Sequence, residues 1–163
     1  MRLLCVLVKC WMKRGQQKRI DTPKSSKWFH LFGAYNWRTD EVITMVAEKK
    51  NSDTFCRFIQ HLFASVPDDR PVVLVLDNAS YHHSAQSEAL LAYFEDRSLT
   101  VWLPPYCSDL NPIERFWLHL KHNACANFPF KSLEQISSSV RKILAVQNDL
   151  QHPDRFLFLK TFC

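Results

Sequence analysis

The chain has 163 residues, of which 47% are hydrophobic and 23% charged, so it can bury a core and is neither a disordered tail nor a fibrous repeat. Its net charge is +5, and its two glycines, Gly15 and Gly33, are too few for a glycine-rich phosphate loop or a dinucleotide-binding fingerprint. We expect residues 1–163 to form a single domain.

Positive charge is concentrated at the N-terminal end of the chain. The first 30 residues contain eight basic side chains and one acid, whereas the other 133 residues have a net charge of −2. A basic end on a nearly neutral domain suits a polyanion such as nucleic acid, although a solvated basic hairpin has the same composition. The side chains predicted to bind nucleic acid are Lys13, Arg14, Lys18 and Arg19.

The cysteines and the first residues indicate a location inside the cell. The six cysteines form no C-x-x-C pair, and most lie in apolar segments, which is typical of buried thiols. The apolar stretch before Lys9 is too short for a signal peptide or a membrane span. We therefore expect no membrane association.

The first half of the chain contains three predicted strands and one helix. Residues 28–36 and 42–47 are predicted to form an antiparallel hairpin. The uninterrupted apolar run at 72–76 predicts a central strand that is covered on both faces. Between them, after cap candidates at 51–53, one helical face is formed by Phe55, Phe58, Ile59, Leu62 and Phe63.

The second half contains three predicted helices and one strand. A helix over 84–97 is followed by a strand over 99–103, which implies a parallel crossover from residues 72–76. Two further helices are expected after Pro112 and after Ser132, and residues 141–163 are expected to be a C-terminal helical extension. The residues of the helix at 84–97 predicted to point inward are Ala85, Ala89, Leu90, Tyr93 and Phe94.

Two acids occupy positions at which catalytic groups gather in open α/β sheets. Asp77 directly follows the strand at 72–76, and Glu114 is the third residue of a helix for which Asn111 is the predicted N-cap. A turn-capping role for Asp77 and a capping box for Glu114 are the structural alternatives. Two converging carboxylates suit two-metal phosphoryl chemistry, and their hard oxygens favour Mg²⁺ or Mn²⁺.

A zinc site and a thiol nucleophile are less favoured by the sequence. His119, His122 and Cys125 share one helix, but a surface histidine pair explains them better because no fourth ligand is evident. Cys107 lies in a loop in which nothing predicts a lowered thiol pKa.

The segments around the two acids carry a family resemblance. The segments LDNASYH at 76–82 and LPPYCSDLNPIERFW at 103–117, with WMKRGQQ at 11–17, resemble the catalytic core of DDE-type transposases of the mariner-related superfamily. The resemblance implies an α/β fold with a ribonuclease-H-like mixed sheet flanked by helices. It also implies that three acids bind two Mg²⁺ or Mn²⁺ ions for cleavage and transfer of DNA strands. Asp77 and Glu114 then correspond to the second and third acids, and Asn78, His82 and Asn111 to neighbours that shape the site.

One departure from the family pattern concerns the first acid. The family carries it on a strand before the WMKRGQQ segment, and residues 1–10 contain no Asp or Glu. Asp21, Asp40 and Glu41 fit its place poorly. We therefore expect an N-terminally incomplete catalytic domain, without the family's helix-turn-helix region, whose catalysis is weak or absent.

Two functions consequently remain open for the chain. It is either a metal-dependent DNA endonuclease and strand transferase or a non-catalytic, domesticated or relic nucleic-acid-binding protein. Both functions take DNA as the partner and place the protein in the nucleus if the source is eukaryotic. Whether the chain forms a homodimer is left open.

Overall fold

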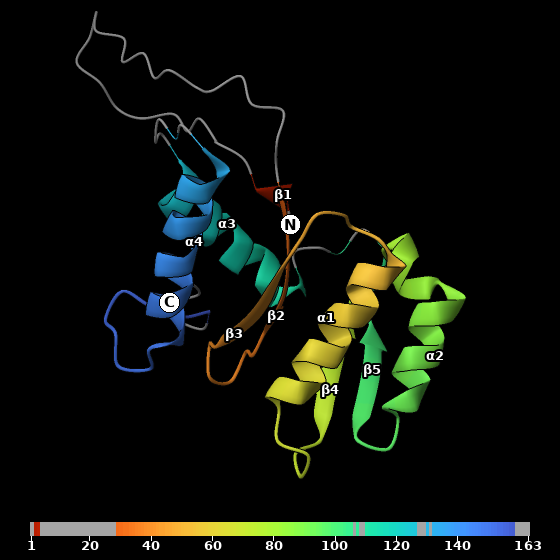
Figure 1. Ribbon diagram of the computed structural model, residues 1–163. Helices are drawn as coiled ribbons and strands as arrows, with labels where there is room; N and C mark the ends of the chain where they lie inside the picture. Colours follow the sequence, from red (N-terminus) through yellow and green to blue (C-terminus); the bar gives the residue numbers. More distant parts are fainter. Residues whose placement is uncertain are drawn as a thin grey trace, which may run out of the picture.

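The chain has an α/β architecture with two small sheets and four α-helices in the residues that the structure describes (Figure 1). The structure, a computed structural model, describes residues 2–3, 29–105, 107, 110–126, 130 and 132–158. The predicted DNA-contacting residues Lys13, Arg14, Lys18 and Arg19, and the acid Asp21, lie outside these ranges. The elements are β1 (Arg2–Leu3), β2 (Phe29–Tyr35), β3 (Val42–Ala47), α1 (Ser52–Ser65), β4 (Val72–Leu76), the 3₁₀-helix η1 (Ser80–His83), α2 (Ala85–Tyr93), β5 (Ser98–Trp102), α3 (Pro112–Cys125) and α4 (Leu133–Asn148).

The first sheet is antiparallel with strand order β1-β2-β3, which confirms the predicted hairpin. Its turn is closed by Asn36, whose N–H donates to the carbonyl of Glu41 over 2.8 Å. Asp40 has a positive φ of 58° there, and its carboxylate accepts hydrogen bonds from the Tyr35 hydroxyl and from the N–H of Phe158. Asp40 and Glu41 therefore belong to the hairpin turn, and the carboxylate of Asp40 is engaged in holding the C-terminal segment.

The second sheet contains the parallel strands β4 and β5, in register from Val72 opposite Ser98 to Leu76 opposite Trp102. Helices α1 and α2 cover one face of this sheet (Figure 1). On that face, Leu74 of β4 belongs to a hydrophobic cluster with residues of both helices. The prediction that residues 72–76 are covered on both faces is wrong for the described structure, because Val73 is 63% exposed and Val75 43% exposed. Within the described residues, antiparallel pairing is confined to the first sheet and parallel pairing to the second.

The inward face predicted for α2 is partly wrong. Leu90 and Phe94 pack against the core as predicted, whereas Ala85, Ala89 and Tyr93 are exposed, and Ser87 and Leu91 are the buried residues of the helix. The Ser87 hydroxyl donates to the carbonyl of Tyr81 over 2.7 Å, so a small polar side chain allows α2 to lie close to η1. Apolar residues surround this helix instead of forming one stripe, and the sequence pattern therefore could not indicate the buried side.

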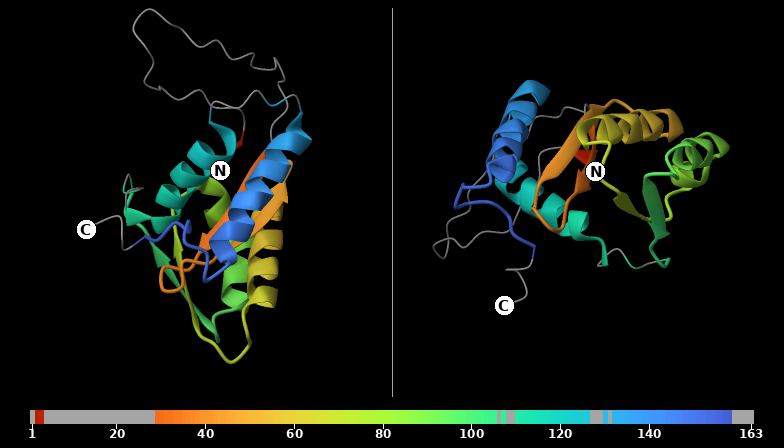
Figure 2. Two further views of the ribbon diagram at one scale, coloured as in Figure 1. Left: turned by 90° about the vertical axis from the view of Figure 1, so that its left-hand side faces the viewer. Right: turned by 90° about the horizontal axis from the view of Figure 1, so that it is seen from below.

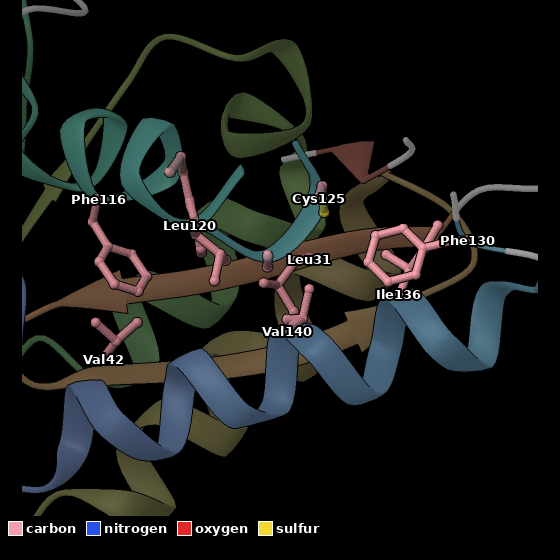
Figure 3. Packing of buried hydrophobic residues seen from close by; sticks show 10 residues of the cluster. Leu31, Val42, Phe116, Leu120, Cys125, Phe130, Ile136 and Val140 are labelled. Atoms are coloured by element: carbon pink, nitrogen blue, oxygen red, sulfur yellow. The ribbon is translucent and has the colours of Figure 1, made fainter. Parts of the chain in front are cut away.

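Strand β2 contributes to two hydrophobic clusters, because neighbouring residues of a strand point to opposite faces. Leu31 belongs to the cluster formed with α3 and α4, which Figure 3 shows, and Phe32 belongs to the cluster formed with α1, α2 and β4. The right-hand view in Figure 2 shows the β2–β3 hairpin between α3 and α4 on one side and α1 on the other. The buried stripe predicted for α1 is confirmed, and the helices expected after Pro112 and after Ser132 are present as α3 and α4.

Helix α4 ends at Asn148, so only the first part of the extension predicted at 141–163 is helical. Residues 149–158 form turns and irregular backbone, and 159–163 lie outside the described residues. The buried side chain of Gln147 holds this segment, because its Oε1 accepts from the N–H of Phe156 over 2.9 Å. No helix within the described ranges is long and apolar enough to span a bilayer.

Candidate active site

Asp77 emerges at the carboxyl end of β4, as the sequence predicts. Its Oδ1 accepts from the N–H of Ala79 at 3.2 Å and lies 3.0 Å from Nδ1 of His82. The hydrogen bond with His82 is the largest of the effects that lower the pKa of Asp77, and burial opposes it. The side chain of Asp77 is 50% exposed, so a carboxylate fixed at one oxygen faces solvent.

His82 and Asn78, two of the predicted site-shaping residues, hold the backbone around Asp77. The ring of His82 is buried against Phe55, with 4.3 Å between the ring centroids. The amide of Asn78 donates to the carbonyl of Leu103, directly after β5. The turn-capping role considered for Asp77 exists through its bond to Ala79, but the same arrangement leaves half of the side chain accessible.

Glu114 lies in the first turn of α3, which begins where the sequence predicts. The side chain of Asn111 accepts from the N–H of Ile113 at 3.4 Å, and Pro112 occupies the first turn. Asn111 thus caps the helix through Ile113 and not through the residue that a capping box requires. The carboxylate of Glu114 is exposed, and the positive end of the helix dipole stabilises its charge.

The hydroxyl of Tyr81 is affected by the charges of both acids. Its ring packs edge-on against Phe32 of β2 and Phe55 of α1, with centroid distances of 6.1 and 6.0 Å. Burial raises the pKa of the Tyr81 hydroxyl, and the negative charges of Asp77 and Glu114 raise it further. The charges of both carboxylates thus reach one hydroxyl, which lies between the end of β4 and the start of α3 in the chain.

Lys50 and Tyr81 are site residues that the sequence analysis missed. Nζ of Lys50 lies 5.2 Å from the centroid of the Tyr81 ring, and its positive charge contributes to lowering the pKa of Asp77. The basic pair at 49–50, just before the Asn51 cap of α1, is visible in the sequence. Nothing in the sequence indicates that this loop reaches η1, which is about 30 residues later in the chain.

The donor set fits Mg²⁺ or Mn²⁺ in kind, because both acids present hard carboxylate oxygens. In the part of the chain that the structure describes, no group of three His, Cys, Asp or Glu side chains is placed to hold a metal ion. The zinc alternative on α3 gains no support, since Cys125 is buried and His122 is exposed. Asp77 and Glu114 therefore remain the two candidate ligands that the sequence predicts.

Comparisons with known proteins agree on one family and one fold. A family model described as "DDE superfamily endonuclease" matches residues 6–137. An insertion element IS630 uncharacterized 39 kDa protein from Shigella sonnei is 28% identical over 134 residues, which are 82% of this chain and 39% of that protein. The uncharacterized protein y4pE/y4sA from Sinorhizobium fredii is 27% identical over 109 residues, or 67% of this chain and 77% of that protein.

Among solved structures, the Mos1 mariner paired end complex with Mn has a similar fold. The TM-score is 0.71 at 17% identity, and the match covers 91% of this chain and 47% of the Mos1 chain. This chain therefore spans less than half the length of the IS630 protein and of the Mos1 chain.

Proposed function

The chain belongs to the DDE superfamily of endonucleases, and on that premise we propose that it is a transposase-derived DNA-binding domain with Asp77 and Glu114 as metal-binding catalytic acids. Its fold is the ribonuclease-H-like α/β fold predicted from the sequence, and the resemblance to mariner-related transposases is confirmed. In this proposal, the two residues are the second and third acids of a site for DNA strand cleavage and transfer.

The observation that carries the proposal is the half-exposed carboxylate of Asp77, held by His82 at the carboxyl end of β4, with the exposed Glu114 at the start of α3. Asp77 and Glu114 would hold the Mg²⁺ or Mn²⁺ ions, which in two-metal sites activate the attacking oxygen and stabilise the leaving oxygen of a phosphodiester. His82 keeps Asp77 ionised and oriented, while Asn78 and Asn111 fix the backbone segments that carry the two acids.

DNA is the proposed partner, and the basic residues at the N-terminal end are proposed to contact its backbone. Lys13, Arg14, Lys18 and Arg19 lie in the most basic stretch of the sequence. The proposal also places the protein inside the cell, in the nucleus of a eukaryotic source. A homodimer is compatible with the same function.

Lys50 is proposed to contact a DNA phosphate beside the two acids. We expect Lys50→Gln to weaken duplex binding and to lower the slope of log affinity against log salt by about one. Lys49→Gln removes the same charge from an exposed neighbour and serves as the matched control. Fluorescence anisotropy over a salt series measures both variants, and equal effects of the two substitutions would contradict a specific role for Lys50.

The experiment that tests the function is the nicking of supercoiled plasmid in Mg²⁺ or Mn²⁺, with a chelated sample beside it. If the chain is a catalytic domain, we expect nicking that depends on the metal ion. This nicking is expected to be weak where Asp77 and Glu114 act without a third acid. Binding of DNA without any nicking would favour the alternative, a non-catalytic domesticated or relic protein. The specific observation behind that alternative is that no group of three His, Cys, Asp or Glu side chains in the described residues is placed to hold a metal ion.

A further inference from the structure

Two aromatic rings outside the carboxylate pair are stacked near the surface beside it. The rings of His83 and Trp102 have centroids 4.2 Å apart and planes at 27°. His83 is exposed, and Trp102 is 37% exposed although tryptophan is a residue that folding usually buries. We propose that this pair stacks on an unpaired base of the DNA that binds at Asp77 and Glu114; this inference rests on the proposed function.

Each ring of the pair is the chain neighbour of a residue that is anchored at the candidate site. His83 follows His82, whose Nδ1 lies 3.0 Å from Asp77. Trp102 precedes Leu103, whose N–H donates to the carbonyl of Leu76 over 2.9 Å and whose carbonyl accepts from Asn78. The pair is therefore fixed at the carboxyl end of β4 and β5, toward which the β5 arrow points in Figure 1.

The chemistry of this pair selects an unpaired base. Flat aromatic side chains bind single-stranded nucleic acid because every base has a π-face, whereas the bases inside a duplex are already stacked on each other. A strand-cleaving site exposes such bases wherever a duplex frays or ends near the reacting phosphate. The stacked rings also stabilise the packing of η1 on β5, and a purely structural role would leave the affinity for DNA tails unchanged.

Trp37 provides a matched control. It is 55% exposed, and the guanidinium of Arg38 lies over its ring at 5.3 Å from the centroid. It belongs to the β2–β3 turn, in the sheet that does not contain β5. Removing Trp37 therefore tests the loss of an exposed tryptophan without touching the proposed base platform.

The experiment measures binding with a chelator present, so that no cleavage occurs. Fluorescence anisotropy compares a blunt duplex with the same duplex carrying a short single-stranded tail. We expect the parent to prefer the tailed DNA, and Trp102→Ala to weaken binding of that DNA about tenfold while leaving the blunt duplex unchanged. His83→Ala is expected to act in the same direction, Trp102→Phe to retain most of the affinity, and Trp37→Ala to change neither DNA.

A tail of abasic nucleotides tests the proposal without any substitution in the protein. We expect the preference of the parent for tailed DNA to disappear with this tail, because the phosphates remain and the bases are gone. If the parent binds blunt, tailed and abasic DNA equally, the base platform is overturned while the proposed DNA-binding function stands. If the parent binds none of the three, both proposals are overturned.

Discussion

Asp77→Asn and Glu114→Gln are each expected to reduce metal-dependent nicking of supercoiled plasmid to the rate of the chelated sample. Each substitution replaces a charged ligand by a neutral amide of nearly the same shape, so the fold should remain. Losing one ligand of a two-metal site costs several kcal/mol of transition-state stabilisation, which corresponds to about a thousandfold or more in rate. Asn at position 77 can still accept the hydrogen bonds that Ala79 and His82 donate to Asp77.

The two substitutions have matched controls within the chain. Glu88→Gln removes an exposed carboxylate from the first turn of α2, as Glu114→Gln does from α3. Asp69→Asn removes an exposed aspartate that precedes β4. Neither control should change nicking. Binding of Mn²⁺, followed by electron paramagnetic resonance, is a second measurement that works even where the parent protein nicks DNA slowly. Variants that bind Mn²⁺ and nick DNA like the parent would contradict the assignment of both acids.

The sequence predicts those elements whose apolar residues form one clear stripe. Helix α1 buries one face, so spacings of three and four residues identified it, and the capping signals before Ile113 and Leu133 identified α3 and α4. Helix α2 has no such stripe, and its buried side is set by the hydrogen bond from Ser87 to Tyr81. An uninterrupted apolar run such as 72–76 indicates a strand, but how many of its faces are covered depends on elements elsewhere in the chain.

Some residues of the candidate site could also be predicted from the sequence, and others could not. The places of Asp77 at a strand end and of Glu114 in a first helical turn could be predicted because local signals define both positions. Asn111 was predicted as a cap because capping depends on adjacent residues. Lys50, Tyr81 and the stacked pair of His83 and Trp102 were missed because the fold brings together segments that are far apart in the chain.

Gly33→Ala is expected to destabilise the fold and to disturb the position of Glu114. A Cβ at Gly33 would lie 2.5 and 2.8 Å from the ring carbons Cη2 and Cζ2 of Trp117, and 3.4 Å from the carbonyl oxygen of Ile43. Trp117 is buried and its ring lies against Phe116, with 5.5 Å between their centroids, so it cannot move aside freely. β2 and α3 must then separate, and overpacking of this kind costs about 1–3 kcal/mol.

The measurement for Gly33→Ala is thermal unfolding followed by circular dichroism. For a chain of this length, a loss of that size lowers Tm by about 4–10 °C. Because Glu114 precedes Trp117 by less than one helical turn, movement of α3 also displaces its carboxylate, and Mn²⁺ affinity should fall with stability. A Gly33→Ala variant with the Tm of the parent would contradict the close contact between β2 and α3.

A double-mutant cycle with Trp117→Phe identifies the physical cause of the Gly33→Ala effect. Phenylalanine lacks the outer ring atoms that a Cβ at Gly33 would meet, so the methyl group has room in that background. Trp117→Phe alone costs stability because it leaves part of the indole space empty. Adding Gly33→Ala to it should cost much less than in the parent, since two residues in contact do not contribute additively. Additive losses would instead mean that Gly33 acts through its own backbone conformation, and the spacing between β2 and α3 would then not be what sets the position of Glu114.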